Sequence, residues 1–170
     1  MSATGAGGAP ACGGERSDSG SASARLAELG IELPEVVAPL AAYVPAVRTG
    51  DLVYTSGQLP MIAGELVRTG KVGGAVSPED ARALARVCAL NALAAVHALV
   101  GIDAVTRVVK VVGFVASAAG FNGQPGVVNG ASALFGEIFG DAGAHARSAV
   151  GVSELPLDAP VEVELIVEVA

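Results

Sequence analysis

Two short polar segments carry side chains that could do chemistry. Residues 55–60 (TSGQLP) lie at the end of a predicted strand, and residues 145–148 (HARS) place Arg147 at the start of another. An arginine guanidinium binds a carboxylate or a phosphate through two parallel hydrogen bonds. A carboxylate such as Glu162 or Glu164 on a neighbouring strand could hold a water molecule or a proton. The alternative is a structural ion pair on the sheet between Arg147 and one of these glutamates.

The chain has two histidines that could act as bases, and they lie in different settings. His97 falls inside a predicted long helix, where a histidine is most often structural. His145 lies in a Gly/Ala-rich loop just before Arg147, which makes it the better candidate for binding or proton transfer. The sequence has no phosphate-binding loop, no His-Glu-x-x-His motif and no clustered metal ligands. We therefore expect no metal site.

The composition argues against several classes of protein. The net charge is −7, from 10 Lys+Arg against 17 Asp+Glu, which disfavours nucleic acid because phosphate binding needs clustered basic residues. About 52% of residues are apolar, but the sequence has no run of about 18 uncharged apolar residues, which a membrane span would need. Cys12 and Cys88 form no metal or redox motif, so a disulfide between them is not expected and a reduced, cytoplasmic setting is the simplest interpretation.

The length of 170 residues fits one domain preceded by a tail. Residues 1–22 are rich in Gly, Ala and Ser, which predicts a disordered tail, and a single domain is expected over residues 23–170. The clearest helix signal is residues 77–80 (SPED), with a cap residue, a proline at the first helical position and acids in the first turn. Helices are predicted over residues 23–29, 78–99 and 125–139. Strands are predicted over residues 43–48, 52–56, 64–68, 103–116, 147–152 and 161–169.

The last predicted strand indicates how the sheet is covered. Its odd-numbered residues are all apolar, and its even-numbered residues are Glu162, Glu164, Ile166 and Glu168. The odd face should pack on the helices, whereas the even face is expected to be wet or to meet another subunit. Two helices on one side of a mixed sheet predict a two-layer α+β sandwich. Its uncovered face favours an oligomer.

From about Ala41 to Val169 the chain resembles the RidA/YjgF/UK114 family of reactive-intermediate deaminases. The resemblance rests on short pieces in a fixed order and on their spacing. The pieces are Tyr43 with the valines that follow it, Ser56-Gly57-Gln58-x-Pro60, Val128-Asn129, Ala146-Arg147-Ser148-Ala149-Val150, Leu155-Pro156 and Val161-Glu162-Val163-Glu164.

This resemblance implies a chorismate-mutase-like α+β fold (β-β-α-β-α-β-β) and a homotrimer with ligand clefts between subunits. It implies hydrolysis of enamines and imines to a 2-keto acid and ammonia, with no metal or cofactor. Arg147 would bind the substrate carboxylate, and Glu162 would position or activate water. The residues that would line the cleft are Tyr43, Ser56, Gly57, Asn129 and His145.

The chain also departs from the family pattern. His145 stands where a proline is usual, Gly151 stands where a glutamate is usual, and extra residues fall around 64–74 and 116–126. Two alternatives therefore stay open beside the deaminase. One is a non-catalytic trimer that binds small carboxylates such as 2-keto acids, and the other, disfavoured by the charge, is an endoribonuclease. A further hypothesis gives His145 a proton-transfer role peculiar to this branch.

Overall fold

The computed structural model describes residues 20–36 and 42–170. In chain order its helices and strands are α1 (Ala22–Glu28), β1 (Ala46–Thr49), β2 (Leu52–Thr55), β3 (Met61–Ile62), β4 (Glu65–Leu66), α2 (Pro78–Val100), β5 (Val105–Ala116), α3 (Gln124–Phe139), β6 (Ala146–Val152) and β7 (Val161–Val169). Three short 3₁₀ turns connect them: η1 (Ile102–Ala104), η2 (Gly140–Gly143) and η3 (Pro156–Asp158).

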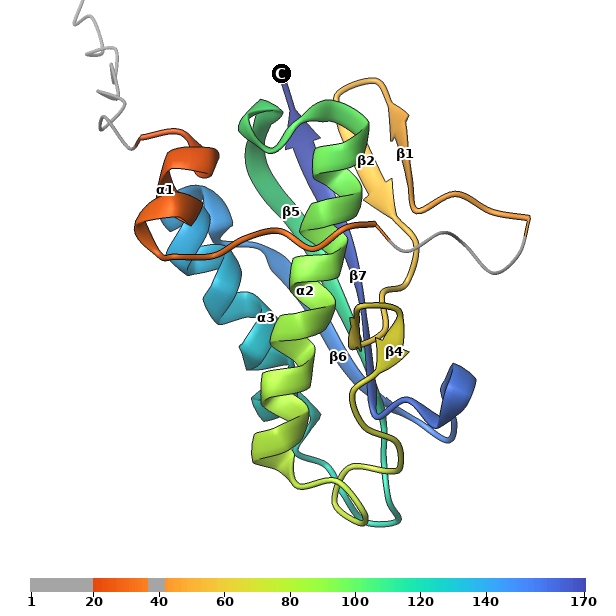
Figure 1. The fold of residues 1–170 in the computed structure, drawn as a ribbon. Helices are drawn as coiled ribbons and strands as arrows, with labels where there is room; N and C mark the ends of the chain where they lie inside the picture. The colour runs from red at the N-terminus through yellow and green to blue at the C-terminus, as the bar shows by residue number, and fades with distance from the viewer. Residues whose placement is uncertain (1–19, 37–41) are drawn as a thin grey trace, which may run out of the picture.

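Five strands form one mixed sheet in the order β1-β2-β7-β5-β6. The β5–β6 pair is parallel, and the other pairs in this sheet are antiparallel. Helices α2 and α3 lie on the same side of the sheet, as Figure 1 shows. The predicted two-layer α+β sandwich is therefore confirmed.

Helix α2 begins and ends where the sequence signals place it. The Ser77 hydroxyl accepts a hydrogen bond from the Asp80 backbone N–H, and Pro78 occupies the first turn. Gly101 follows the last turn with φ of 82°, a conformation that favours glycine. Caps of this kind satisfy backbone groups that the helix leaves without partners. The predicted range 78–99 thus differs from the observed helix by one residue.

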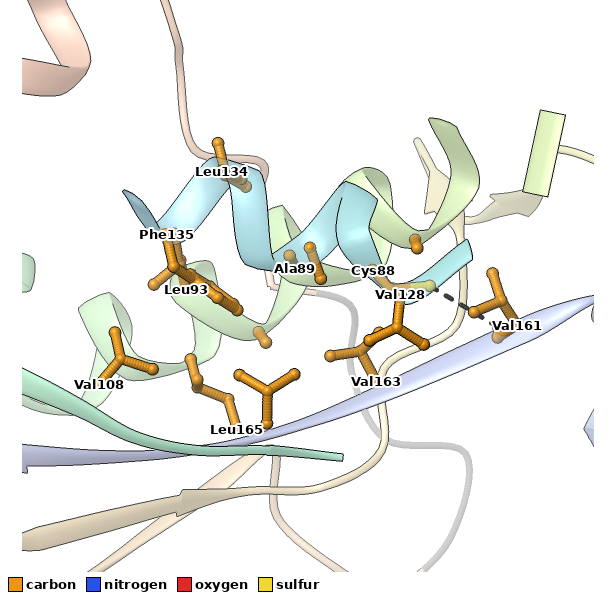
Figure 2. Packing of buried hydrophobic residues seen from close by; sticks show 14 of the residues in the cluster. Cys88, Ala89, Leu93, Val108, Val128, Leu134, Phe135, Val161, Val163 and Leu165 are labelled. Carbon is orange, nitrogen blue, oxygen red and sulfur yellow. Dashed lines mark hydrogen bonds between the residues drawn. The ribbon is translucent and has the colours of Figure 1, made fainter. Parts of the chain in front are cut away.

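The core lies between the helices and the odd-numbered face of β7 (Figure 2). Val161, Val163 and Leu165 are at most 1% exposed; Leu165 lies toward Leu93 and Phe135, whereas the two valines lie toward Cys88 and Val128. The Cys88 thiol lies in the same layer and donates to the Val161 carbonyl at 3.7 Å. Burial, together with the nearby Glu162 charge, raises the pKa of the Cys88 thiol, so it stays protonated.

Helix α2 is long and apolar enough to cross a membrane by length and composition alone. However, 56% of its most apolar 18-residue window is buried inside the protein. A buried central helix of a sandwich has the same composition as a membrane span, because both are apolar on most sides. Packing against α3 and the sheet therefore accounts for the apolar character of α2.

Two of the predicted strands differ clearly from the observed ones. The strand expected over 43–48 begins only at Ala46, and the strand expected over 64–68 is half of a small β3–β4 hairpin. Ala63 and Gly64 have positive φ angles and form the turn of this hairpin. The apolar pattern of the sequence did not reveal this turn. The tail predicted for residues 1–22 lies almost wholly outside the described residues, and α1 begins at its last position.

The N-terminal helix α1 is attached to the rest of the fold by polar contacts. The Ser23 backbone N–H and hydroxyl both donate to the Asp103 carboxylate, at 2.8 and 2.7 Å. These hydrogen bonds lower the pKa of Asp103. Arg25 donates through Nε to the Glu137 carbonyl at the end of α3. The predicted helix 23–29 is thus confirmed and lies against α3 and η1.

Glycine brings the two long helices into close contact. A Cβ built on Gly130 of α3 would overlap the backbone carbonyl of Arg82 on α2. In contrast, a Cβ on Gly136 of the same helix would meet nothing within 4 Å. The α2–α3 distance therefore depends on the absence of a side chain at residue 130.

We predict that Gly130→Ala destabilises the protein by about 2 kcal/mol or more, because α2 must move away from α3. Gly136→Ala is the matched control on the same helix and should stabilise by about 0.5–1 kcal/mol, since alanine favours a helix over glycine. Urea unfolding of both variants at one protein concentration measures the difference. Equal free energies of unfolding in the two variants would contradict this packing.

Candidate functional site

One group of the predicted site residues lies where α3 crosses the edge strand β6. Asn129 and Ser132 are three residues apart on α3, so they project from the same helix face. Arg147 faces α3 from β6, and its Nη1 donates to Asn129 Oδ1 at 2.7 Å and to Ser132 Oγ at 3.1 Å. Residues 145 and 147 lie on one side of the chain because successive strand residues alternate. The helix period and the strand period thus bring these side chains together.

Arg147 forms no salt bridge with an acidic side chain in the part of the chain that the structure describes. Both of its hydrogen bonds through Nη1 go to neutral oxygens, and its side chain is half-buried. The structural ion pair with Glu162 or Glu164 that the sequence left open is therefore wrong. The pair is absent because Arg147 faces the helices, whereas both glutamates face the other side of the sheet.

His145 lies directly beside this group. Its Nε2 is 2.9 Å from Ser132 Oγ, and its Nδ1 is 2.6 Å from the Gly143 carbonyl oxygen. The edge of the Phe135 ring and the imidazole meet at nearly a right angle, with 5.8 Å between ring centroids. His145 and Asn129 were predicted from the sequence, whereas Ser132 was missed. The signal that could have found Ser132 is its position one helical turn after Asn129.

The second group surrounds Glu162 on β7. A Cβ on Gly57 would overlap the Glu162 carboxylate, so this carboxylate lies directly against the Gly57 backbone. Gln58 and Val163 exchange backbone hydrogen bonds of 2.9 and 3.0 Å, which fix the loop after β2 beside β7. Partial burial, and to a lesser degree the charge of Glu164, raises the pKa of Glu162. The glycine in the Ser-Gly-Gln motif therefore makes room for a half-buried carboxylate.

The remaining predicted residues lie next to this second group. The Ser56 hydroxyl donates to the Val44 carbonyl at 2.6 Å, which connects the loop after β2 to the chain before β1. Tyr43, adjacent to Val44, is 51% exposed. In one chain Tyr43 is therefore an open surface residue, and Ser56 has a clear structural role.

Arg147 and Glu162 lie on opposite faces of the sheet. Arg147 is paired with the buried Val111 of β5, and Glu162 is paired with Phe114, which has the opposite orientation. The two residues are separated by two strand spacings and three residues along the strand, about 14 Å between Cα atoms. A single chain therefore cannot bring both side chains onto one small molecule.

No helix or strand of residues 20–36 and 42–170 covers the sheet face that carries Glu162. This face also carries Val47, Tyr54 and Val150, which are 50%, 38% and 43% exposed. Lys110 lies on the same face and donates to Ser148 Oγ at 3.0 Å. Exposed apolar side chains next to carboxylates are typical of a surface that meets another subunit.

His97 has the structural role expected for it. Its Nδ1 accepts a hydrogen bond of 3.1 Å from the Ile102 backbone N–H, just after the end of α2. The ring thus stabilises the connection between α2 and β5. Within residues 20–36 and 42–170, no three His, Cys, Asp or Glu side chains are grouped so that they could hold a metal ion.

The fold and these two groups define a class of two-layer α+β proteins with an arginine and a carboxylate on opposite faces of one sheet. The family model described as "YjgF/chorismate_mutase-like, putative endoribonuclease" matches residues 23–169. The chain belongs to this family.

Individual relatives agree with this assignment. Protein TCP17 of Trypanosoma cruzi is 43% identical over 152 residues, which cover 88% of this chain and 95% of that protein. The 2-iminobutanoate/2-iminopropanoate deaminase of Dermatophagoides farinae is 33% identical over 138 residues, which cover 81% of this chain and 93% of that protein. The crystal structure of Atu1372, a protein of unknown function from Agrobacterium tumefaciens, is 44% identical with a TM-score of 0.81, covering 88% of this chain and 92% of that chain. The family and fold expected from the sequence are thus confirmed.

We predict that Glu162→Gln stabilises the protein at pH 7 and that this gain disappears as the pH falls. The raised pKa of Glu162 means that the folded protein binds its proton more tightly than the unfolded chain does. Ionised Glu162 therefore opposes folding above the folded-state pKa. The opposition is lost below the pKa of an unfolded glutamate, about 4.3.

Urea unfolding between pH 3.5 and pH 7.5, at one protein concentration, measures this difference. Glu168→Gln is the control, because Glu168 lies on the same strand face but is exposed, and surface substitutions usually change stability by less than about 0.5 kcal/mol. A gain for Glu162→Gln that is the same at every pH would contradict the interpretation.

Proposed function

We propose that this protein hydrolyses 2-imino acids and their enamine tautomers to 2-keto acids and ammonia. The observation that carries the proposal is Arg147, a half-buried cation held by neutral partners and without an acidic one among the described residues. Such a guanidinium is preorganised to bind the carboxylate of a ligand. The relative from Dermatophagoides farinae, a 2-iminobutanoate/2-iminopropanoate deaminase, supports this substrate class.

Asn129 and Ser132 orient the guanidinium through Nη1, so other N–H groups of Arg147 can form a fork for a carboxylate. The binding of a planar carboxylate by this fork would fix the adjacent imine carbon. A fixed imine carbon is what a water molecule needs to add from one defined direction. In this proposal Asn129 is therefore a positioning residue for Arg147.

Glu162 supplies the proton transfer in the proposed reaction. The carboxylate takes a proton from water as the water oxygen forms a bond to the imine carbon. It then gives that proton to the nitrogen, which forms a carbinolamine. The carboxylate next takes the proton of the new hydroxyl and passes it to the same nitrogen, so that the C–N bond breaks, ammonia leaves and the carbonyl of the keto acid forms. One imine and one water become one 2-keto acid and one ammonia, without a change in oxidation state. The raised pKa of Glu162 suits a group that both accepts and donates a proton.

The site is proposed to form between subunits of a homotrimer, because one chain keeps its two halves apart. Arg147 of one subunit would meet Glu162 of the next, together with Tyr43, Ser56 and Gly57 of that second subunit. Three observations support this arrangement: the opposite orientation of Arg147 and Glu162, the exposure of Tyr43, and the exposed apolar side chains on the face that carries Glu162. A cyclic arrangement would repeat the same contact at each boundary.

We predict that Arg147→Ala lowers kcat/KM for 2-imino acid hydrolysis by about 100-fold or more, because a charge-assisted carboxylate contact is lost. The imine is generated in the assay by an amino acid oxidase, and keto acid formation is compared with the rate in buffer. Arg107→Ala, an exposed arginine of the same sheet, is the matched control and should retain activity.

Two results would contradict the proposal. One is a wild-type rate equal to the buffer rate with several 2-imino acids. The other is full activity in Arg147→Ala. Saturable binding of a 2-keto acid without any turnover would replace the deaminase by a carboxylate-binding trimer, the alternative left open by the sequence. The net charge of −7 continues to argue against RNA as the substrate.

We predict that two inactive variants restore each other's activity when they are mixed as subunits. Arg147→Ala and Glu162→Gln are co-refolded in equal amounts, so that subunits assort at random. If Arg147 and Glu162 come from different chains, about one quarter of the sites in cyclic trimers contain both wild-type residues. The mixed preparation should then show about one quarter of the wild-type rate.

Separately refolded samples combined afterwards are the control and should remain inactive. A mixed preparation that also remains inactive, although it contains hybrid trimers by mass spectrometry, would show that both residues act from the same chain. The measurement therefore separates an inter-subunit site from a site within one subunit.

A further inference from the structure

Arg147, Ser132 and His145 form a hydrogen-bond chain, which we call the Arg–Ser–His relay, and its third member, His145, has no role in the proposed hydrolysis. Gly143 accepts at one end through its carbonyl oxygen, 2.6 Å from His145 Nδ1. A carbonyl oxygen only accepts, so Nδ1 carries a hydrogen. In the neutral ring Nε2 is then the acceptor, and the Ser132 hydroxyl donates to it. The Ser132 oxygen in turn accepts from Arg147 Nη1.

Packing fixes the imidazole at the centre of this relay. Gly143 is buried, and a Cβ on it would overlap the Phe135 carbonyl, so the loop lies directly on the backbone of α3. The edge-to-face contact with Phe135 holds the ring from one side. The ring orientation therefore does not depend on the Ser132 contact alone, and His145 can hold Ser132 in one rotamer.

The charges around the imidazole are few. Arg107 of β5 and Glu168 of β7 line the same surface hollow of about 650 Å³ as His145. These two residues are paired across the strands, so their opposite charges partly cancel at the ring. Asp141 of η2 is exposed two residues before Gly143, and Arg147 lies beyond Ser132. The group coupled to His145 through hydrogen bonds is therefore Arg147.

We propose that the Arg–Ser–His relay makes carboxylate binding at Arg147 depend on the protonation state of His145. Histidine is the side chain that changes charge between about pH 5 and pH 8. Neutral His145 accepts from Ser132 and thereby orients Arg147. Protonated His145 instead donates a hydrogen bond to Ser132. Two positive charges, the imidazolium and the guanidinium, then lie on either side of the Ser132 hydroxyl. A bound carboxylate relieves the repulsion between the two cations, so binding becomes tighter as the pH falls.

The proposal rests on the proposed function only where it assigns a carboxylate to Arg147. The probe is therefore pyruvate, whose binding is measured by calorimetry rather than by turnover. Wild-type affinity should increase about fivefold from pH 8 to pH 5.5, the effect of a unit charge about 8 Å away at an effective dielectric constant of about 40. His97→Gln, the matched histidine control at the end of α2, should show the same increase.

Substitutions at His145 separate its two effects. His145→Ala should weaken binding at pH 8, and His145→Gln should restore most of that loss, because the amide oxygen can accept from Ser132 without titrating. Neither variant should show the wild-type increase at pH 5.5. In a Ser132→Ala background, His145→Ala should weaken binding at pH 8 much less than in the wild type, because the connection is already broken.

Three results would overturn the relay. They are an undiminished increase at pH 5.5 in His145→Gln, additive losses in the double variant at pH 8, and an Arg147 side-chain Nε–H signal in NMR spectra that does not shift as His145 titrates. The NMR measurement needs no ligand, so it decides the matter even if Arg147 binds no pyruvate. Conversely, a protein with the expected pH dependence and no imine hydrolysis would retain the relay and lose the proposed deaminase function.

Discussion

The register of β5 with its two neighbours is the constraint on which the rest of the structure depends. β5 pairs antiparallel with β7 on one side and parallel with β6 on the other. Because partners across a ladder face the same side, Val111 directs Arg147 toward the helices and Phe114 directs Glu162 away from them. A shift of one residue in either pairing would move one of these side chains to the other face. The proposed division of the site between two subunits thus follows from two strand registers.

Close backbone approach then determines which side chains meet on the helix side. Gly113 of β5 leaves room for Val128, the residue before Asn129, since a Cβ at 113 would overlap the Val128 side chain. Gly143 in the same way lets η2 lie on the end of α3. These contacts place one face of α3 against the start of β6. Glycines, of which the chain has 23, therefore act at these positions by letting backbones approach rather than by filling volume.

Much of the fold could be predicted because its signals are local. The alternation in β7 and the cap of α2 predicted the bounds of both elements to within one residue. Each of these patterns results from the geometry of a single strand or helix. The β3–β4 hairpin was missed because its turn uses a non-glycine residue with positive φ, Ala63, for which the sequence carries no signal. Ser132 was missed because its importance depends on a neighbour that lies 13 residues later in the chain.

The candidate site was harder to predict than the fold for a related reason. The motifs identified Arg147 and Glu162, but the sequence also left open a structural ion pair between Arg147 and Glu162 or Glu164. Only the strand order, with β5 between their strands, shows that the two side chains diverge. The sheet face to which a side chain points depends on the register of its strand. Register is set by pairing between distant segments, so short motifs do not reveal it.

The separation of Arg147 from Glu162 also separates the two groups that would respond to pH. In the proposed site His145 acts on substrate binding in one subunit, whereas Glu162, with its raised pKa, acts on water from another. Protonation of the two groups would have opposite consequences, because a charged His145 favours the carboxylate and a neutral Glu162 no longer accepts a proton from water. Since the sheet lies between the two groups within each chain, the surroundings of His145 and those of Glu162 are independent of each other. The replacement of the usual proline by His145 could therefore alter binding in this branch without changing the surroundings of Glu162.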